Sequence, residues 1–428
     1  MDTIFALSSA PGRAGVALVR VSGPGAALAA RTLCGSLGAP RRAVLRGIVV
    51  DGEVLDTALV TYFVQGQSFT GDDTVELAVH GSGAVVRRLL EVLSGFEGLR
   101  PAGPGEFTQR AFDNGRMDLA QVEALADLID AETEVQRRLA VAGLGGVLAE
   151  RAARWREALV SASALVAAAI DFADEDVPDD VLAGLVHLLE PVMEDLRLEA
   201  AGAMAAERLR EGFEVAIVGE PNVGKSTLLN FLAGRRAAIT SEVAGTTRDV
   251  IEVRMEIAGL PVTLLDTAGI RDSEDTIERI GVDLARERAA AADLRLVLSV
   301  DGEVPSGVAL QPGDIVVRAK ADLARDPAGG VSGLTGVGVQ PLLDAISGEL
   351  AQRVTEIRAM TQARHRSCAD AARKSIACAL REVRAGTGRE EFVAEHLRSA
   401  MASLDTLVGK VGVEDILGEV FSRFCIGK

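Results

Sequence analysis

The segment that most constrains the fold is a glycine-rich loop in the middle of the chain. Residues 219–226 read Gly-Glu-Pro-Asn-Val-Gly-Lys-Ser and match the pattern G-x-x-x-x-G-K-[ST] in full. A short apolar run, 214–218, precedes the loop, and a helical pattern, 227–233, follows it. A strand, a phosphate-binding turn and a helix in that order predict a doubly wound α/β domain.

In such a loop, backbone N–H groups and the positive end of the helix cradle phosphates. We expect Lys225 to reach the β- and γ-phosphates of a nucleotide, and Ser226 to place its hydroxyl on Mg²⁺. The other predicted contacts of the loop are Asn222, Val223, Gly224 and Thr227.

Two further motifs indicate GTP rather than ATP. The sequence Gly-Thr-Thr-Arg-Asp at 245–249 suits a switch segment, with Thr247 as the second Mg²⁺ hydroxyl. The sequence Asp-Thr-Ala-Gly at 266–269 directly follows a strand-like run; Asp266 would hold the metal through water, and the Gly269 N–H would meet the γ-phosphate. The predicted nucleotide contacts of these segments are Ser241, Glu242, Val243, Ala244, Gly245, Thr246, Thr247, Asp266, Thr267, Ala268 and Gly269.

The guanine-reading motif departs from its usual Asn-Lys-x-Asp form. Here it reads Ala319-Lys320-Ala321-Asp322. Asp322 can accept hydrogen bonds from the guanine N1–H and exocyclic amine, and Lys320 can pack over the base. Ala319 supplies no amide, so we expect retained base selectivity with weaker affinity. The next loop, 332–336, holds Gly333 where a Ser-Ala-Lys-type loop has alanine.

A glutamine that orients water in Ras-like enzymes is also replaced, here by Ile270. Hydrolysis therefore needs another group, and Glu278, in the polar run 271–279, is the candidate. The other charges of that run are best interpreted as solvated side chains of a switch.

Composition and periodicity divide the chain into three domains. Residues 1–117 predict an α+β module, 118–210 and 356–428 a split helical domain, and 211–355 the inserted P-loop domain. The net charge of −17 and the 3% aromatic content argue against a basic or base-stacking nucleic-acid surface. The four cysteines form no disulfide framework, and no apolar run is long enough for a membrane span.

Motifs outside the P-loop domain give the chain a specific resemblance. They are the sequences at 10–16 with 20–23 (Ala-Pro-Gly-Arg-Ala-Gly-Val, Arg-Val-Ser-Gly), 68–73 (Ser-Phe-Thr-Gly-Asp-Asp), 104–112 (Pro-Gly-Glu-Phe-Thr-Gln-Arg-Ala-Phe), 117–121 (Met-Asp-Leu-Ala-Gln) and 424–428 (Phe-Cys-Ile-Gly-Lys). With them, nearly the whole chain resembles the MnmE (TrmE) family of tRNA-modification GTPases.

The resemblance implies an N-terminal module that forms a homodimer and binds 5-formyl- or 5,10-methylene-tetrahydrofolate. The positions that match the family's folate site are Arg20, Glu76, Arg116 and Lys428. Arginine and lysine suit the carboxylates of folate, and a glutamate suits the N–H edge of the pterin.

The resemblance also implies a K⁺ ion that is bound by Asn222 with oxygens of Ser241, Val243 and Thr246, and it supports Glu278 as the group that orients water. Such a cation would take the place of an arginine finger between two facing G domains. Cys425 is a candidate nucleophile or thiolate acid/base near the folate, with a packing or exposed cysteine as the alternative.

The implied reaction takes place in the cytoplasm at the wobble uridine of certain tRNAs. With an FAD-dependent partner, MnmG (GidA), in a heterotetramer-type complex, the family installs an aminomethyl or carboxymethylaminomethyl group at C5 and takes its one-carbon unit from folate. Two other functions stay open at this point: a GTP switch in ribosome assembly, and a folate-dependent one-carbon transferase that acts on a small molecule.

Overall fold

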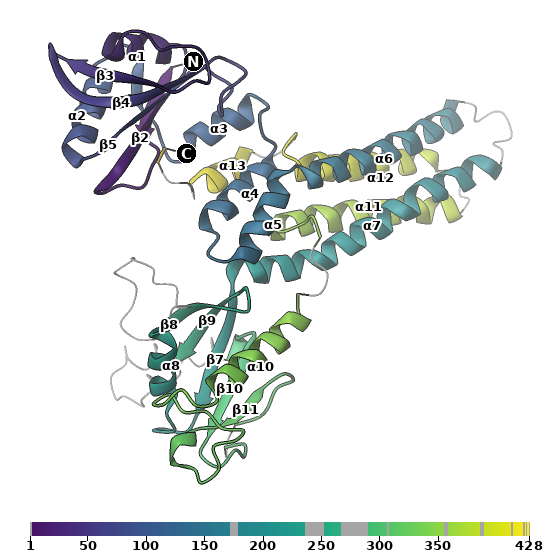
Figure 1. Ribbon diagram of the computed structural model, residues 1–428. Coiled ribbons are helices and arrows are strands. Elements are labelled where there is room, and N and C mark those ends of the chain that lie inside the picture. The colour runs from purple at the N-terminus through teal and green to yellow at the C-terminus, as the bar shows by residue number, and fades with distance from the viewer. Residues whose placement is uncertain are drawn as a thin grey trace, which may run out of the picture. The chain divides into compact units, whose positions relative to one another are not determined.

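Figure 1 shows the computed structural model of the 428-residue chain. The structure describes residues 2–171, 179–235, 252–266, 290–305, 308–354, 358–385, 389–411, 414–422, 424, 426 and 427. The chain divides into two compact units that are both discontinuous in sequence. The first comprises Met1–Ala126, Leu144–Ala153 and Asp405–Lys428, and the second comprises Asp127–Gly143 and Arg154–Leu404.

A six-stranded sheet with the order β3-β4-β5-β2-β1-β6 organises the first unit. All neighbouring strands are antiparallel except β1 and β6, which are parallel. Helices α1 (Ala26–Cys34) and α2 (Gly83–Ser94) pack against one face of the sheet, over buried residues such as Val19, Val60 and Leu77. The strands are β1 (Thr3–Leu7), β2 (Ala14–Ser22), β3 (Val44–Val50), β4 (Glu53–Phe63), β5 (Thr74–Gly81) and β6 (Leu99–Pro101).

Side chains alternate along each strand, so the face of this sheet opposite α1 and α2 carries a different set of residues. The cross-strand partners Arg20 and Glu76 lie there. Helix α3 (Glu106–Asp113) covers the same side near β1, where Phe107 packs with Ile4, Ala6 and Phe69. Sequence alternation therefore separates a helix-covered core from a polar site on the other face.

Both ends of the chain contribute to the first unit. The start of α4 (Leu119–Asp130) and the helix α13 (Glu414–Ser422) meet in an aromatic cluster. Val122, Phe421 and Phe424 are buried at its centre, and Phe112 packs against them. This cluster holds the last residues of the chain on the N-terminal unit.

Helices make up one part of the second unit: the short α5 (Glu134–Leu144) and the longer α6 (Val147–Asp171), α7 (Asp179–Glu211), α11 (Ala363–Ala385) and α12 (Glu390–Leu407). The first residues of α6 and the last residues of α12 fall in the first unit. Buried residues recur at helical spacing along α11, for example Ala369, Ala372 and Ile376, and this face packs on α7 (Figure 1). Hydrogen bonds tie α6 and α12 to this pair: the Trp155 Nε1–H of α6 donates to Asp195 of α7, and the Ser375 hydroxyl of α11 donates to the Ser399 Oγ of α12.

The P-loop domain is a five-stranded sheet with the order β11-β10-β7-β9-β8. Its strands are parallel except for the β8–β9 pair. Leucines of α8 and α10 bury the sheet's hydrophobic residues in one core. The elements are β7 (Phe213–Gly219), α8 (Lys225–Ala233), β8 (Glu252–Ile257), β9 (Leu260–Asp266), β10 (Leu294–Ser299), β11 (Ile315–Arg318), the 3-10 helix η2 (Ala321–Leu323) and α10 (Val339–Gln352).

Helix α5 joins the P-loop domain to the long helices. Val135 and Leu139 of α5 pack on the core of the P-loop domain. The Gln136 Nε2 donates to the carbonyls of Leu209 (3.3 Å) and Arg210 (3.0 Å) in the last turn of α7. A cavity of about 510 Å³ lies beside this junction, between α5, the end of α7 and the β8–β9 pair.

The expected architecture is confirmed: an α+β N-terminal module, a helical part assembled from distant segments, and an inserted doubly wound P-loop domain. The predicted domain boundaries remain predictions. Within the described residues, no helix combines the length and hydrophobicity that a membrane crossing requires.

Candidate functional site: a nucleotide-phosphate loop and an Arg–Glu pair on the N-terminal sheet

The loop between β7 and α8 has the shape of a phosphate cradle. A Cβ on Gly219 would stand 2.4 Å from the Leu298 carbonyl oxygen of the neighbouring strand β10, so only glycine fits there. Asn222 and Gly224 adopt left-handed backbone conformations, with φ of 61° and 116°. These turns direct the loop back to the start of α8, as the motif predicts.

Lys225 spans this loop from inside. Its Nζ donates to the carbonyl oxygens of Gly219 (2.7 Å) and Glu220 (3.0 Å), and the residue is only 6% exposed. Burial lowers the pKa of Lys225, while the nearby carboxylate of Asp266 opposes the shift. The ammonium group therefore sits in the loop at the place where a nucleotide phosphate would become its partner.

Ser226 and Asp266 meet as the sequence predicts. The Ser226 Oγ donates to the Asp266 Oδ2 over 2.7 Å, and Asp266 is buried at the end of β9. A hydroxyl and a carboxylate are the hard oxygen donors that Mg²⁺ prefers. The residues present thus fit a magnesium ion between the loop and β9.

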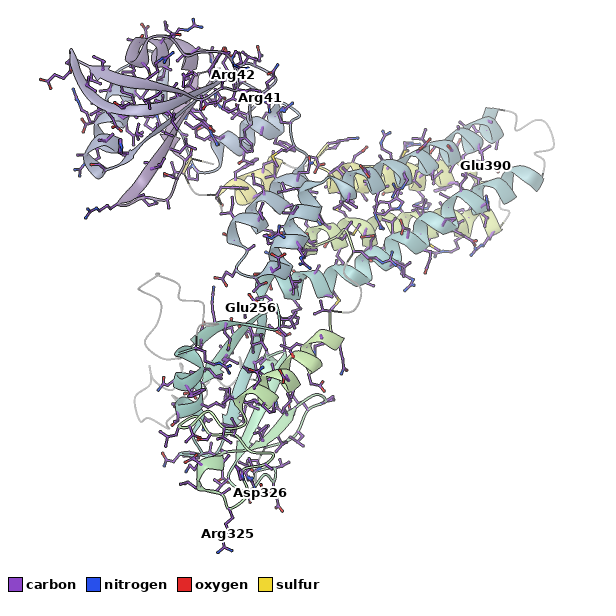
Figure 2. The ribbon with its side chains drawn as sticks, viewed as in Figure 1. Arg41, Arg42, Glu256, Arg325, Asp326 and Glu390 are labelled. Atoms are coloured by element: carbon purple, nitrogen blue, oxygen red, sulfur yellow. The ribbon has the colours of Figure 1, made fainter. Side chains whose placement is uncertain are left out.

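The guanine-reading segment follows β11. The Ala319 N–H donates to the Ser299 carbonyl over 2.7 Å, and Ala319 is buried in the domain core. Lys320 turns the chain with φ of 56°, and Asp322 is exposed. Figure 2 shows Arg325 and Asp326 further along the same connection, at the outer end of the domain. Asp322 thus lies outside the core, where its carboxylate can bind a guanine base.

Gly333 draws the following loop directly onto α8. A Cβ at this position would stand 2.5 Å from the Leu228 backbone nitrogen and 2.7 Å from the Thr227 carbonyl carbon. The Ser332 Oγ meanwhile accepts the N–H groups of Leu334 and Thr335, both over 3.2 Å. The glycine that stands in place of alanine is therefore a requirement of this packing, which the sequence motif alone does not reveal.

Several predicted nucleotide and cation contacts lie outside the described residues. They are Glu278 and the residues Ser241, Glu242, Val243, Ala244, Gly245, Thr246, Thr247, Thr267, Ala268 and Gly269. Of the predicted K⁺ ligands, Asn222 is described, and it is exposed on the phosphate loop.

A second candidate site lies on the N-terminal sheet. The Arg20 Nε and Nη2 donate to one oxygen of Glu76 over 3.0 and 2.9 Å. Their side chains are 16% and 24% exposed. Two aromatic rings enclose the guanidinium, with Arg20 Cζ 5.4 Å from the ring centroid of Phe69 and 5.6 Å from that of Phe107. Two of the four predicted folate residues are thus brought together.

The other two predicted folate residues, Arg116 and Lys428, are not part of the Arg20–Glu76 pair. Arg116 is exposed on the turn after α3, beside the 68–73 loop, where a Cβ on Gly71 would come within 3.3 Å of the Arg116 Cγ. Lys428 lies outside the described residues, as does Cys425. The neighbouring Ile426 forms an antiparallel bridge with Pro104, so the chain end reaches the N-terminal unit.

Sequence reasoning missed the roles of Phe69 and Phe107. Both fall inside the motifs that carry the family resemblance, at 68–73 and 104–112. That placement was the available signal, because a motif aromatic beside a site arginine suggests a cation–π contact. Among the other cysteines, burial raises the pKa of the Cys34 thiol to about 11, which leaves it protonated near neutral pH.

Comparisons with known proteins cover the whole chain. A family model described as the MnmE helical domain matches residues 119–425, and one described as the GTP-binding protein TrmE N-terminus matches residues 3–116. The protein named tRNA modification GTPase MnmE of Cereibacter sphaeroides (strain ATCC 17025 / ATH 2.4.3) is 53% identical over 431 residues, 100% of each chain. Proteins of that name from Roseobacter denitrificans and Paracoccus denitrificans are 52% and 48% identical, also over 100% of each chain.

A solved structure of the protein Era of Aquifex aeolicus is similar to part of the chain. It is 27% identical, covers 38% of this chain and 66% of that chain, and has a TM-score of 0.26.

Proposed function

This chain belongs to the MnmE family of tRNA modification GTPases, and from that premise we propose that it is a K⁺-stimulated GTPase activated by dimerisation, which modifies the tRNA wobble uridine with a folate one-carbon unit. The chain is a GTP hydrolase. The observation that carries the GTPase chemistry is the meeting of Lys225, Ser226 and Asp266 at one end of the β7–β9 pair.

The protein's part in hydrolysis follows from these contacts. On GTP binding, the Lys225 ammonium exchanges the carbonyls of Gly219 and Glu220 for phosphate oxygens. The positive charge of Lys225 is thus already in place beside the phosphates, and the loop need not rearrange. Ser226 would hold Mg²⁺ directly and Asp266 would hold it through water. Bound Mg²⁺ neutralises the charge that develops on the transferred phosphoryl group.

The K⁺ proposal rests on Asn222. Its left-handed backbone (φ of 61°) presents an exposed amide from the phosphate loop, and its oxygen is a suitable donor for K⁺. The other proposed ligands are Ser241, Val243 and Thr246. We expect Asn222→Ala to abolish stimulation of hydrolysis by K⁺ while GTP still binds. An unchanged ratio of rates in K⁺ and Na⁺ would remove Asn222 from this role.

Glu278 is proposed to orient the attacking water, because Ile270 cannot do so. The expected result for Glu278→Ala is slow hydrolysis with unchanged nucleotide affinity. Single-turnover hydrolysis and nucleotide titration separate these two quantities. A normal hydrolysis rate in the variant would exclude Glu278.

The folate proposal is supported by the Arg20–Glu76 pair and its two aromatic neighbours. In the free protein the two charges satisfy each other. A folate would offer a carboxylate to an arginine and a pterin N–H edge to Glu76, and the rings of Phe69 and Phe107 provide flat apolar contacts. Arg116 and Lys428 are proposed as further carboxylate partners, and Cys425 as an acid/base or nucleophilic thiol. Bound folate supplies the one-carbon unit.

Exposed apolar side chains on the same sheet face support homodimerisation. Leu45 is paired with Leu59 across β3 and β4, and Val49 is paired with Val54. All four are exposed, by 63%, 48%, 42% and 67% respectively. Exposed apolar side chains that gather on one face of a sheet suit an association surface. Replacement of Leu45 and Leu59 by lysine should shift the sedimentation of the protein towards a monomer, whereas an unchanged dimer would place the interface elsewhere.

The partner proposal follows from charge. With a net charge of −17, the chain is poorly suited to binding an RNA backbone on its own. We therefore assign much of the tRNA contact to the FAD-dependent partner MnmG (GidA), in a heterotetramer-type complex in the cytoplasm. The test is tRNA binding as a function of added partner. Equal tRNA affinity with and without the partner would contradict this division of labour.

A further inference from the structure

A histidine of β5 and an aspartate of β4 form a hydrogen-bonded pair on the N-terminal sheet. The His80 Nδ1 lies 2.7 Å from the Asp56 Oδ1, and the Asp56 Oδ2 accepts the backbone N–H of His80 over 2.8 Å. The Asp56 Oδ1 also accepts the Thr57 N–H over 2.8 Å. The backbone pairing of β4 with β5 ends at Leu59 and Ala78, so beyond this point the carboxylate links the two strands.

This carboxylate determines which nitrogen of the imidazole carries a proton. Burial raises the pKa of Asp56, but the hydrogen bonds from the N–H groups of His80 and Thr57 and from the His80 ring outweigh burial, and the pKa lies below the ordinary value of 3.8. Asp56 is therefore ionised near neutral pH, and an ionised carboxylate only accepts hydrogen bonds. The Nδ1 of His80 then carries the shared proton, which makes the Nε2 of the neutral ring a proton acceptor.

The imidazole of His80 is open to solvent, whereas its partner is enclosed. The side chains of His80 and Asp56 are 71% and 10% exposed. Side chains alternate along β5, so His80 lies on the same side of the sheet as Glu76 and Ala78, while Val79 is buried in the core under α1 and α2. An enclosed carboxylate behind an exposed imidazole is the arrangement that orients a histidine for accepting protons.

The His80–Asp56 pair shares its sheet face with the Arg20–Glu76 site. Glu76 and His80 are four residues apart on β5, which corresponds to roughly 13 Å along the strand. Ala78 lies between them, and its partner on the neighbouring strand β2 is Leu18 (Figure 1). Two apolar side chains therefore separate the charged pair from the imidazole, and such a surface suits the flat ring of a nucleobase.

We propose that His80 is a catalytic base in the modification of uridine, and that Asp56 is the positioning residue that orients its imidazole. The inference rests on the proposed wobble-uridine reaction. The group on which His80 acts is the C5–H of the uridine that receives the one-carbon unit.

Substitution at C5 of uridine requires such a base. When the carbon substituent is attached, an electron pair of the ring forms the new bond at C5, and the original C5–H bond must then break. The electron pair of that bond returns to the ring, and the proton passes to the Nε2 of His80. The Asp56 carboxylate stabilises the resulting imidazolium, which gives its proton to water after the product leaves. This proton removal itself needs no oxidant or reductant.

Tritium at C5 of uridine reports this step directly. The experiment combines the full chain with GTP, 5,10-methylenetetrahydrofolate, an ammonium salt, the FAD-dependent partner and a tRNA that carries tritium at C5 of its uridines. It measures the tritium released into water. His80→Ala should release tritium about 100-fold more slowly or less, because a general base contributes at least that factor. GTP hydrolysis should be retained, since the phosphate loop lies in another domain.

Added imidazole distinguishes a lost base from a damaged fold. The side chain of His80 is exposed, so imidazole from solution should enter the space left in His80→Ala and raise the rate of tritium release. A purely structural role predicts no such rescue. His80→Gln keeps an amide that can bond Asp56, and it should be as slow as the alanine variant if that variant is unstable. The matched control is His187→Ala, which removes an exposed histidine of α7 and should release tritium like the wild type.

Asp56→Asn tests the positioning role. Tritium release should slow by about tenfold or more with His80 in place, because an amide no longer fixes the tautomer of the imidazole. Release at the wild-type rate would show that Asp56 does not orient the base. For His80 itself, a wild-type rate in both variants, or a slow rate that imidazole fails to raise in His80→Ala, would overturn the assignment. If the wild type releases no tritium, the proposed uridine modification is wrong, and this inference with it.

Discussion

Gly333→Ala is the substitution for which the sequence motif and the structure predict opposite effects on guanine binding. By motif, alanine is the usual residue at this place in the base loop, and restoring it would be expected to help guanine binding. In the structure, the new Cβ would stand 2.5 Å from the Leu228 nitrogen, 2.6 Å from the Leu228 Cα and 2.7 Å from the Thr227 carbonyl carbon. We therefore expect the restored alanine to weaken binding.

The magnitude follows from these distances. Atoms in favourable contact lie about 3.5–4.0 Å apart, so the loop must retreat from α8 by roughly 1 Å. Overpacking of this kind costs about 1–3 kcal/mol. If the loop relieves the clash in the free protein but must be seated to hold the base, that cost appears as roughly five- to 150-fold weaker binding of GDP.

The assay is titration with a fluorescent guanine nucleotide. Gly348→Ala in α10 is the control, because a Cβ there meets nothing within 4 Å. It should leave affinity unchanged and stabilise the helix by about 0.5–1 kcal/mol. If Gly333→Ala binds the nucleotide as tightly as the wild type or more tightly, the base loop does not rest on α8 and this prediction is wrong.

Three further predictions concern metal binding and stability. Ser226→Ala should weaken Mg²⁺-dependent GTP affinity, because it removes the hydroxyl that meets Asp266; an unchanged Mg²⁺ titration would contradict this. Gln136→Ala should lower the free energy of unfolding by about 2–4 kcal/mol, since its Nε2 loses two hydrogen bonds to the end of α7 and its Oε1 loses those from the Glu132 and Thr133 N–H groups; an unchanged urea midpoint would count against it. Burial raises the pKa of Asp314, but the Arg295 guanidinium and the Gln311 N–H together outweigh burial, and the net pKa lies below the ordinary value of 3.8. The ion pair therefore contributes to stability above pH 3.8, and this contribution is lost as the pH falls through the lower pKa of the folded state. Asp314→Asn should accordingly destabilise most near pH ~7 and progressively less as the pH falls below the ordinary value of 3.8, so a destabilisation that does not change with pH would rule out the ion pair.

The phosphate site was predictable because its determinants are local. Gly219, Lys225 and Ser226 occur within eight consecutive residues, and the apolar run before them predicts the strand that holds them. Asp266 was predictable for the same reason, as the residue at the end of the next parallel strand. Short-range patterns of this kind determine where a parallel sheet presents its polar residues.

Contacts between distant segments could not be predicted in this way. The sequence marks Gly333 as a departure from a motif, and only the approach of its loop to α8 shows why glycine is needed. Phe69 and Phe107 were recognised as members of motifs, but their common contact with Arg20 depends on how α3 packs on the sheet. The close contact between Gly427 and the Leu7 backbone brings together residues that lie 420 positions apart in the sequence, and no local pattern encodes such a contact.

We propose that this chain hydrolyses GTP in order to modify the wobble uridine of tRNA. The most direct measurement is mass analysis of tRNA nucleosides from a strain that lacks the gene, complemented with the wild type or with Lys225→Ala. We expect the nucleoside with an aminomethyl or carboxymethylaminomethyl group at C5 to disappear in the deletion strain, to return with the wild type and to stay absent with Lys225→Ala. Persistence of that nucleoside in the deletion strain, or its full return with Lys225→Ala, would contradict the claim.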